Sequence, residues 1–316
     1  MPDLRIDESV SPAAHRAGML AALQAGRVDN RFHYVGERSA AMWRALASAH
    51  SPAQAEDGLA AYDDAARAAI AALPAGPVHV IGVACGDGVK ERRLLGALVS
   101  AGHAEVHATA VDVSVPLVTA ASAAMAGVPG VGEADAVAVD ITAVSDLSPL
   151  LGPRRRGARV VTLFGVVSTL GPGALEPALS LLAPGDVLMV SANLLPDRAG
   201  ARDNVMAQYD NPPTRAWLNA VLEDIGLAGA GSITMRWHEA PDSLAIVGEV
   251  TPPGALVADV EGVTVQMPAG RPIRVLESFR HDPAGLEALM RGAGLARVVA
   301  CISPSGEEGV AVAIAA

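Results

Sequence analysis

The chain has 316 residues, of which 51% are apolar and 3% aromatic, and its formal net charge is −11. This length exceeds one typical domain, so we expect a large core domain and a smaller second unit. The negative charge argues against a nucleic-acid partner, which needs clustered Lys and Arg, and no apolar run reaches the roughly 18–20 residues of a membrane span.

The first 74 residues are predicted to form a helical segment, which could act as a lid. Its start is polar and lacks the layout of a secretory signal, so we expect a cytoplasmic protein. Apolar residues at helical spacing predict helices over 15–25, 39–49 and 54–73. Phe32 and Tyr34 lie in an aromatic-polar loop between the first two helices. This loop is either a staple that packs the helices onto the body or a cover over a ligand.

From residue 77, short β-rich runs alternate with helical stretches, a pattern typical of a parallel α/β sheet. Strands are predicted over 78–83, 106–111, 136–139, 159–163 and 187–192. Helices are predicted over 90–101, 114–126 and 173–182. We therefore expect a Rossmann-like, cofactor-binding sheet domain over residues 75–195.

A second β-rich block follows a loop and helix at 197–226. Its strands are predicted over 233–238, 244–250, 256–260, 263–266 and 273–279. A helix over 283–293 and a final strand, at 298–302 or 310–315, complete the prediction. The block at 196–282 is interpreted as a smaller substrate-binding unit, and 283–316 as a return to the main sheet.

The sharpest local signal is a glycine-rich turn that follows the first predicted strand of the sheet. Small residues such as Ala84 and Gly86 let backbone N–H groups approach a ligand, and a helix N-terminus favours negative charge. The run GVACGD that begins at Gly82 lacks the middle glycine with which dinucleotide folds hold a pyrophosphate. Lys90 is followed by Glu91, so there is no phosphate-binding P-loop either. The turn is either an unliganded structural turn or one suited to a ligand without phosphate, whose carboxylate Lys90 could bind.

Two acidic residues stand at the ends of the next two predicted strands. Asp112 lies 26 residues after Gly86, where a carboxylate can accept both hydroxyls of an adenosine ribose. Asp140, with the apolar Ile141 beside it, follows the third strand, where an acid can face an adenine amino group. The first acid is equally expected of a nicotinamide-dependent dehydrogenase. The second favours S-adenosylmethionine (SAM).

Taken in order, the motifs resemble those of the histidine-specific methyltransferase family of the ergothioneine pathway, from about residue 32 to the end of the chain. The family's Val-Asp-Val-Ser motif is matched literally at 111–114. Phe164-Gly165 is similar to its strand end before a proline and a helix, and 182–186 to its Leu-x-Pro-Gly-Asp. Tyr209-Asp210-Asn211 is similar to its Tyr-Asp-Asp turn, and 278–281 to its late Ser-x-Lys segment.

The resemblance implies a class I methyltransferase sheet with SAM as cofactor and a small molecule as acceptor. The cofactor-binding residues are then Ala84, Gly86, Lys90, Asp112, Ser114, Asp140, Ile141, Phe164 and Gly165. The predicted catalytic residues are Tyr209, Asp210 and Tyr34, and the predicted substrate-binding residues are Phe32, Thr169, Asn211 and Ser278. The alternatives are that both tyrosines only pack against the sheet, and that Asp210 only caps the helix that begins near Thr214.

The substrate half of the chain departs from the family pattern. Leu276 stands where the family's histidine enzymes place an imidazole-binding carboxylate. We therefore expect an amino-acid-derived or natural-product intermediate, not free histidine, as acceptor. If a general base is needed, His33, His281 and Glu277 are the candidates. No residues have metal-ligand spacing. The remaining hypotheses are an NAD(P)-dependent oxidoreductase and a SAM-binding protein without catalysis.

Overall fold

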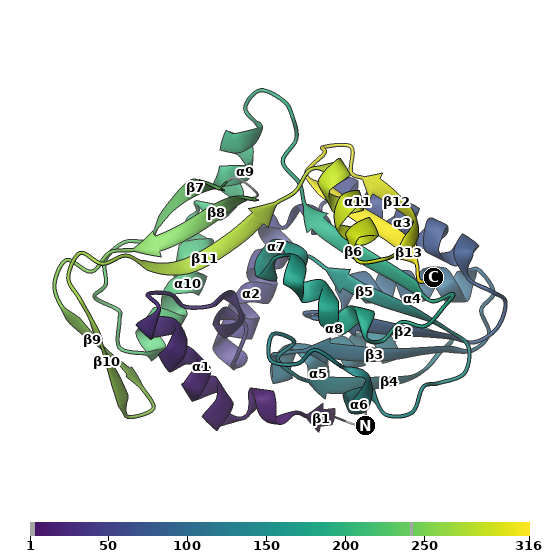
Figure 1. Ribbon diagram of the computed structural model, residues 1–316, viewed down its shortest axis with the longest axis horizontal. Coiled ribbons are helices and arrows are strands. Elements are labelled where there is room, and N and C mark those ends of the chain that lie inside the picture. Colours follow the sequence, from purple (N-terminus) through teal and green to yellow (C-terminus); the bar gives the residue numbers. More distant parts are fainter. Residues whose placement is uncertain (1–3, 241–242) are drawn as a thin grey trace. The chain divides into compact units, whose positions relative to one another are not determined.

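The computed structural model describes residues 4–240 and 243–316, which form two compact units (Figure 1). The first unit contains the described parts of residues 1–7, 52–196 and 281–316. The second contains residues 8–51 and 197–280. Each unit is therefore built from separate pieces of the chain, and each has its own hydrophobic core.

The first unit is organised around an eight-stranded sheet in the order β1-β4-β3-β2-β5-β6-β13-β12. Its strands are β1 (Leu4–Ile6), β4 (Val131–Ala138), β3 (Val106–Asp112), β2 (Val78–Val83), β5 (Ala158–Phe164), β6 (Val187–Asn193), β13 (Glu308–Ile314) and β12 (Ala296–Ile302). The pairs from β1 to β6 are parallel, whereas β13 is antiparallel to both of its neighbours. This confirms the predicted Rossmann-like sheet, which β13 extends as an antiparallel strand beside β6.

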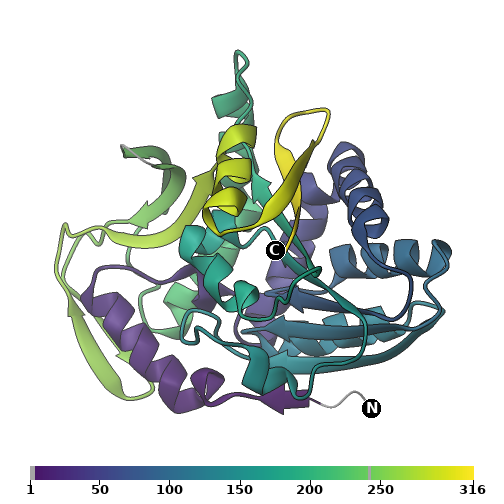
Figure 2. The same cartoon turned by 45° about the vertical axis from the view of Figure 1, so that its right-hand side comes forward.

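The helices of the first unit lie on both faces of this sheet. They are α3 (Glu56–Ala72), α4 (Val89–Ser100), α5 (Val115–Ala126), α6 (Ser148–Leu151), α7 (Val167–Leu170), α8 (Leu175–Leu179) and α11 (Pro283–Gly292). The helices α3, α4 and α5 contact one another in succession, while α8 packs on β5. Helix α11 lies beside β12 and β13, all drawn in yellow in Figure 2. The strand order runs one way from β2 to β4 and the other way from β2 to β6, so crossovers of the usual right hand place helices on both faces.

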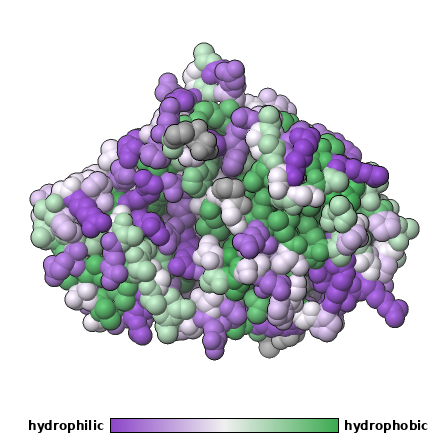
Figure 3. Space-filling model, viewed as in Figure 1, coloured by the Kyte–Doolittle hydropathy of each residue, from purple (hydrophilic) through white to green (hydrophobic). Residues whose placement is uncertain are grey.

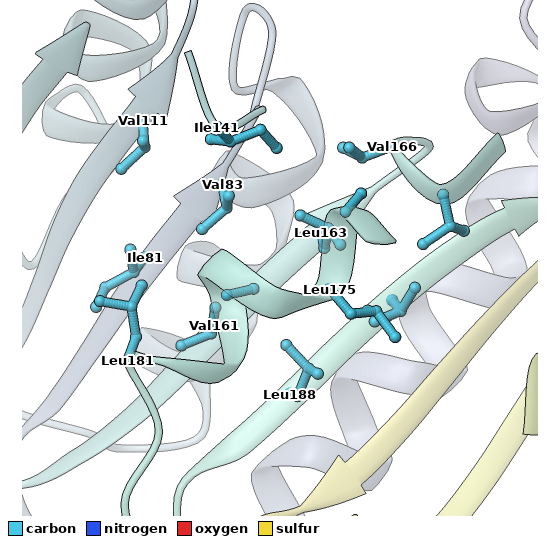
Figure 4. Packing of buried hydrophobic residues seen from close by; sticks show 14 of the residues in the cluster. Ile81, Val83, Val111, Ile141, Val161, Leu163, Val166, Leu175, Leu181 and Leu188 are labelled. Carbon is cyan, nitrogen blue, oxygen red and sulfur yellow. The ribbon is translucent and has the colours of Figure 1, made fainter. Parts of the chain in front are cut away.

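The core of the first unit consists of aliphatic side chains, because the chain has so few aromatic residues. Val83, Leu163 and Leu188 from three neighbouring strands are fully buried in one cluster with Leu175 and Leu181 (Figure 4). The strands of a parallel sheet are covered on both faces, which explains why they appear in the sequence as continuous apolar runs.

Three details of this unit correct the sequence prediction. The helix predicted over 173–182 is a 3-10 turn (Pro172–Ala174) followed by α8, which ends where the Ser180 hydroxyl donates to the Pro177 carbonyl at 2.7 Å. Both of the alternative final strands are present, as β12 and β13. Strand β1 is too short to show any periodicity, and it was therefore not predicted.

The second unit contains a three-stranded antiparallel sheet and a separate hairpin. The sheet has the order β11 (Ile273–Arg280), β8 (Ser243–Val250) and β7 (Thr234–Ala240), and the hairpin pairs β9 (Leu256–Val260) with β10 (Val263–Met267). Four helices, α1 (Pro12–Gln24), α2 (Glu37–His50), α9 (Ala201–Tyr209) and α10 (Pro212–Asp224), belong to the same unit. Met19 of α1 and Leu218 of α10 are buried in one cluster with Ile273.

The expected N-terminal segment 1–74 is divided between the two units. Helices α1 and α2 belong to the second unit, because their apolar side chains join its core. Helix α3 belongs to the first, because its small residues Ala61, Ala65 and Ala69 are buried on the side that contacts β12 and β13.

The described part of the chain has no helix that is both long and apolar enough to cross a membrane. Among the described residues, the large apolar side chains that remain exposed lie on β1 (Leu4, Ile6), α4 (Val89), the β9–β10 hairpin (Val257, Val263) and β12 (Val299). Figure 3 shows hydrophilic residues interspersed with apolar ones on the face in view.

Candidate functional site

The glycine-rich turn joins β2 to α4 through a run of left-handed backbone conformations. Gly86 and Gly88 have φ values of 59° and 72°, and Ala84 has φ of 50° although it carries a Cβ atom. A non-glycine residue in this region costs about 1–2 kcal/mol. At Gly88 a Cβ atom would lie 3.0 Å from Cα and Cβ of Ala121, so glycine lets α4 begin close to α5. The turn therefore keeps backbone N–H groups at the start of α4 in a fixed arrangement.

The Asp112 carboxylate is hydrogen-bonded to the backbone of this turn. Its Oδ2 atom accepts a hydrogen bond from the Gly86 N–H at 2.8 Å, and its Oδ1 atom accepts one from the Ser114 N–H at 2.9 Å. The Val113 N–H also hydrogen-bonds to this carboxylate. A carboxylate has about four acceptor positions, so acceptor capacity remains for a ligand hydroxyl. Burial raises the pKa of Asp112 to about 6, against the effect of these hydrogen bonds. The carboxylate is thus held in one orientation at the end of β3.

Asp140 lies two residues beyond the end of β4, the strand that neighbours β3. It is 2% exposed, and its Oδ1 atom accepts hydrogen bonds from the backbone N–H and the hydroxyl of Thr142 at 2.9 and 2.7 Å. The adjacent Ile141 is part of the core cluster (Figure 4). In the parallel register Asp112 pairs with Ala138, so both acids lie at the carboxyl edge of the sheet.

Lys90 extends from the first turn of α4 to the carboxyl end of β5. Its Nζ atom donates to the Phe164 carbonyl at 3.4 Å and lies 5.6 and 5.8 Å from the ring centroids of Tyr62 and Phe164. A Cβ atom at Gly165 would lie 3.8 Å from this nitrogen. The ends of β2, β3 and β5 thus gather Lys90, Gly86 and Asp112 at the point where the strand order reverses. Ligands of open α/β sheets bind at such points.

Two further predicted residues of the first unit have local structural roles. Ser114 is fully buried and caps α5 by accepting a hydrogen bond from the Leu117 N–H at 3.4 Å. The Thr169 hydroxyl donates to the Gly165 carbonyl at 3.1 Å, so it lies beside the Phe164-Gly165 strand end. Binding of substrate by Thr169 stays a prediction.

In the second unit, Tyr209 lies at the end of α9 and contacts β11. Its hydroxyl is 3.0 Å from the Ser278 hydroxyl, and the Arg280 guanidinium carbon is 4.9 Å from its ring centroid. The structure therefore brings together two residues that the sequence placed 69 positions apart. Tyr34 belongs to the same unit but packs edge-on against Trp43 and Trp217, at 5.6 and 5.4 Å between ring centroids. That Tyr34 and Tyr209 share one cavity stays a prediction.

The polar residues of the turn after Tyr209 form an ion pair and a helix cap. Asp210 forms an ion pair with Arg215. The cap of α10 is Asn211, which accepts a hydrogen bond from the Thr214 N–H at 2.9 Å, so the alternative that Asp210 caps this helix is wrong. Phe32 is 3% exposed and packs in the core of the second unit, as the staple interpretation requires. The catalytic role of Asp210 and the substrate contacts of Phe32 and Asn211 stay predictions.

The candidates for a general base are placed in different surroundings. His33 is fully buried, and burial lowers its pKa to about 4, so it is neutral at neutral pH. The Glu277 carboxylate accepts a hydrogen bond from Arg274 at 2.7 Å. His281 belongs to the first unit, where its backbone N–H donates to the Asn193 carbonyl at 3.1 Å.

Three polar side chains beside the predicted residues were missed by sequence reasoning. Glu91, next to Lys90, is fully buried and accepts a hydrogen bond from the Thr162 hydroxyl at 2.9 Å. The Tyr62 hydroxyl donates to Glu308 Oε1 of β13 at 2.5 Å and accepts a hydrogen bond from the buried Ser191 hydroxyl of β6 at 2.7 Å. Arg280 follows Ser278 at the two-residue spacing of a strand, which is the one signal that could have placed both on one face. Nothing in the sequence near Tyr62 indicates its distant partners.

No protein-family model and no curated protein matches the chain. Among solved structures it is similar to the magnesium protoporphyrin IX methyltransferase of Synechocystis PCC 6803 with bound SAH (13% identity, 90% of this chain, 96% of that chain, TM-score 0.43). It is also similar to SAM-bound CalS10, an amino pentose methyltransferase from Micromonospora echinaspora (15% identity, 81% and 90%, TM-score 0.39). It spans 47% of the citrinin polyketide synthase CMeT domain structure, with 76% of this chain covered, 14% identity and a TM-score of 0.41.

Proposed function

We propose that the chain is a SAM-dependent methyltransferase that acts on a small molecule. The observation that carries this proposal is the hydrogen bond from the Gly86 N–H to the Asp112 carboxylate. The turn that contains Gly86 lacks the glycine pattern for binding a pyrophosphate. Asp140 at the neighbouring strand end supports an adenosine ligand.

The residues at the carboxyl edge of the sheet fit the parts of SAM. Asp112 would accept the ribose hydroxyls, Asp140 the adenine amino group, and Ile141 would pack beside the ring. The Lys90 ammonium, with the N-terminal turn of α4, would bind the carboxylate of the amino-acid part. When bound, SAM supplies an electrophilic methyl group.

The residues that we propose for the acceptor lie in the second unit. The Tyr209 hydroxyl, held by Ser278, is suited to orient a nucleophile. Methyl transfer is an in-line displacement, to which a protein contributes mainly by positioning and by excluding water. Leu276 stands where the resembled family has a carboxylate that binds the imidazole. An amino-acid-derived or natural-product intermediate therefore fits this site better than free histidine. The free thiols of Cys85 and Cys301 support the cytoplasmic location that we expect.

Calorimetric titration with S-adenosylhomocysteine tests the proposed cofactor site. We expect wild-type protein to bind it and the Asp112→Asn variant to bind roughly tenfold or more weakly, because a charge-assisted hydrogen bond contributes about 1.5–3 kcal/mol. Asp135→Asn is the matched control, since Asp135 lies on β4 and pairs with Arg155. Binding of NAD in place of S-adenosylhomocysteine would favour the oxidoreductase. Binding without methyl transfer to any of a panel of small acceptors would favour the non-catalytic SAM-binding protein.

A further inference from the structure

Arg280, at the end of β11, is a buried cation with unused hydrogen-bond donors. The residue is 7% exposed, and its Nε and Nη2 atoms have no hydrogen-bond partner. Among the described residues no carboxylate forms an ion pair with it. Burying a charge is strongly unfavourable unless it is paired and hydrogen-bonded. The protein therefore keeps a costly group at this position.

Arg280 belongs to a small polar cluster, the Arg280 cluster, which also contains Tyr209 and Ser278. Ser278 and Arg280 lie on the same face of β11, because strand residues two apart point to the same side. Tyr209 covers this face from α9, with its ring 4.9 Å from the guanidinium carbon and its hydroxyl 3.0 Å from the Ser278 hydroxyl. A cation-π contact positions the guanidinium but uses none of its N–H groups.

The carboxylates near the cluster in chain or sheet position already have other partners. Asp282, two residues after Arg280, caps α11 by accepting a hydrogen bond from the Gly285 N–H at 2.7 Å. Asp210, next to Tyr209, pairs with Arg215. Glu277, next to Ser278, accepts from Arg274 at 2.7 Å.

Glu239, the acid in register with Arg280 across the three-stranded sheet, is also paired with another arginine. Glu239 of β7 and Arg280 both pair in register with Leu244 of β8, and Glu239 forms an ion pair with Arg202. The charge that balances Arg280 is thus not supplied by these acids of the second unit.

The unused donors define the chemistry of the missing partner. The Nε–H and the parallel Nη2–H form the side-on edge of the guanidinium, which binds both oxygens of a carboxylate or a phosphate. The Tyr209 and Ser278 hydroxyls are hydrogen-bonded to each other, so one of their two protons lies between them and at most one O–H remains to donate to the same anion. One guanidinium and no second cation within the cluster favour a single negative charge.

We propose that the Arg280 cluster binds a carboxylate of the methyl acceptor, so that the substrate is a small carboxylic acid. This inference rests on the proposed function for the identity of the ligand as an acceptor. The anion site itself does not depend on it, because its residues lie in the second unit and the proposed cofactor residues lie in the first.

The test is an NMR titration of 15N-labelled wild-type protein, observing the arginine Nε–H resonances. The Arg280 signal is assigned by its absence from Arg280→Lys. We expect sodium acetate to shift this signal saturably, and neutral acetamide at the same concentrations to leave it in place. A signal that does not respond to acetate, or responds equally to acetamide, overturns the anion site. Tighter binding of inorganic phosphate than of acetate overturns the assignment to a carboxylate.

Variants identify the donors, with Arg236→Met as the matched control. The Arg236 guanidinium lies on β7, is half exposed, and is paired with both oxygens of Glu249 at 3.0 and 3.1 Å. We expect acetate binding to be lost in Arg280→Met and retained in Arg236→Met, and to weaken roughly three- to tenfold in Tyr209→Phe and Ser278→Ala. Retained binding in folded Arg280→Met also overturns the site. The wild-type titration decides the matter if a variant does not fold.

Titration of the same samples with S-adenosylhomocysteine separates the two proposals. We expect its affinity to be the same in Arg280→Met as in wild type. If wild-type protein binds acetate at Arg280 but not S-adenosylhomocysteine, the proposed function fails and the anion site stands. If it binds S-adenosylhomocysteine and acetate leaves Arg280 unaffected, the cofactor site stands and the carboxylate site fails.

Discussion

The Cγ atom of Glu91 occupies the space into which any side chain at Gly82 would extend. A Cβ atom at Gly82 would lie 2.9 Å from that Cγ and 3.0 Å from Cβ of Cys85. The strand position and the helix position therefore compete for one buried space, and here the carboxylate comes from the helix.

This relationship predicts the effect of Gly82→Ala. We expect the variant to lose about 1–3 kcal/mol of unfolding free energy through overpacking, as measured by denaturant titration. Combining it with Glu91→Ala should restore part of the loss, because the two changes act on the same space and are not additive. Gly96→Ala is the control, since a Cβ atom there meets nothing within 4 Å and should stabilise α4. Full additivity of the two changes would contradict the shared space.

Glu91 also predicts how stability depends on pH. Burial raises the pKa of Glu91 from 4.5 to about 7 in the folded protein, so the folded state binds the proton more tightly than the unfolded state. The free energy of unfolding should therefore fall as pH rises from about 4.5 to about 7, by up to about 3 kcal/mol. Asp112, whose pKa is raised to about 6, adds a fall of the same sign between about 4 and 6.

Denaturant titrations across this pH range check the prediction. Glu91→Gln should flatten the decline, whereas Glu176→Gln, which changes an exposed carboxylate of α8, should not. If Glu91→Gln declines as steeply as wild type, Glu91 is not the group responsible.

Lys90→Met should weaken binding of S-adenosylhomocysteine roughly tenfold or more, because the ammonium would lose a charge-assisted contact to the ligand carboxylate. Calorimetry measures the affinity. Arg92→Met is the control, because Arg92 is an exposed cation only two residues further along α4. Equal losses in both variants would show that only the general charge of α4 matters.

Free L-histidine should be a poor substrate at best. Leu276 is 6% exposed and lies on β11, where the family pattern has a carboxylate for the imidazole. An imidazole N–H left without a partner in a closed pocket costs about 1–3 kcal/mol. Mass spectrometry of reactions with SAM and histidine checks this, and efficient trimethylation would falsify it. Leu276→Glu tests whether a carboxylate at this position improves turnover of histidine.

Local sequence patterns predicted most of the fold, because apolar periodicity and turn residues depend on neighbours that are close in the chain. The apolar run of β2 was placed with its bounds. Asp112 at the end of β3 and Asp140 two residues beyond β4 were located from the ends of the predicted strands. The hydrogen bond from the Gly86 N–H to Asp112 is the kind of contact that a turn followed by a strand-end acid predicts.

The sequence could not show features that arise from distant partners. Ala84 adopts a left-handed conformation that a sequence would assign to glycine. Tyr62 and Glu308 are hydrogen-bonded although 246 residues separate them. Arg280 becomes part of a polar cluster only because α9 places the Tyr209 ring over its guanidinium. Division of the first 74 residues between two cores likewise depends on which apolar face each helix presents.

The interleaving of the two units along the chain has a consequence for folding. The path leaves the first unit after residue 7, returns at 52, leaves again after 196 and returns at 281, so neither unit can be excised as one uninterrupted fragment. Closing the main sheet requires β13 to pair with β6, which joins Asn193 to Glu308 across the whole second piece of the other unit. Pairings of such long sequence separation form slowly, because the entropy of loop closure must be overcome before they contribute stability. We therefore expect completion of the sheet to be a late folding event that depends on the segment 197–280.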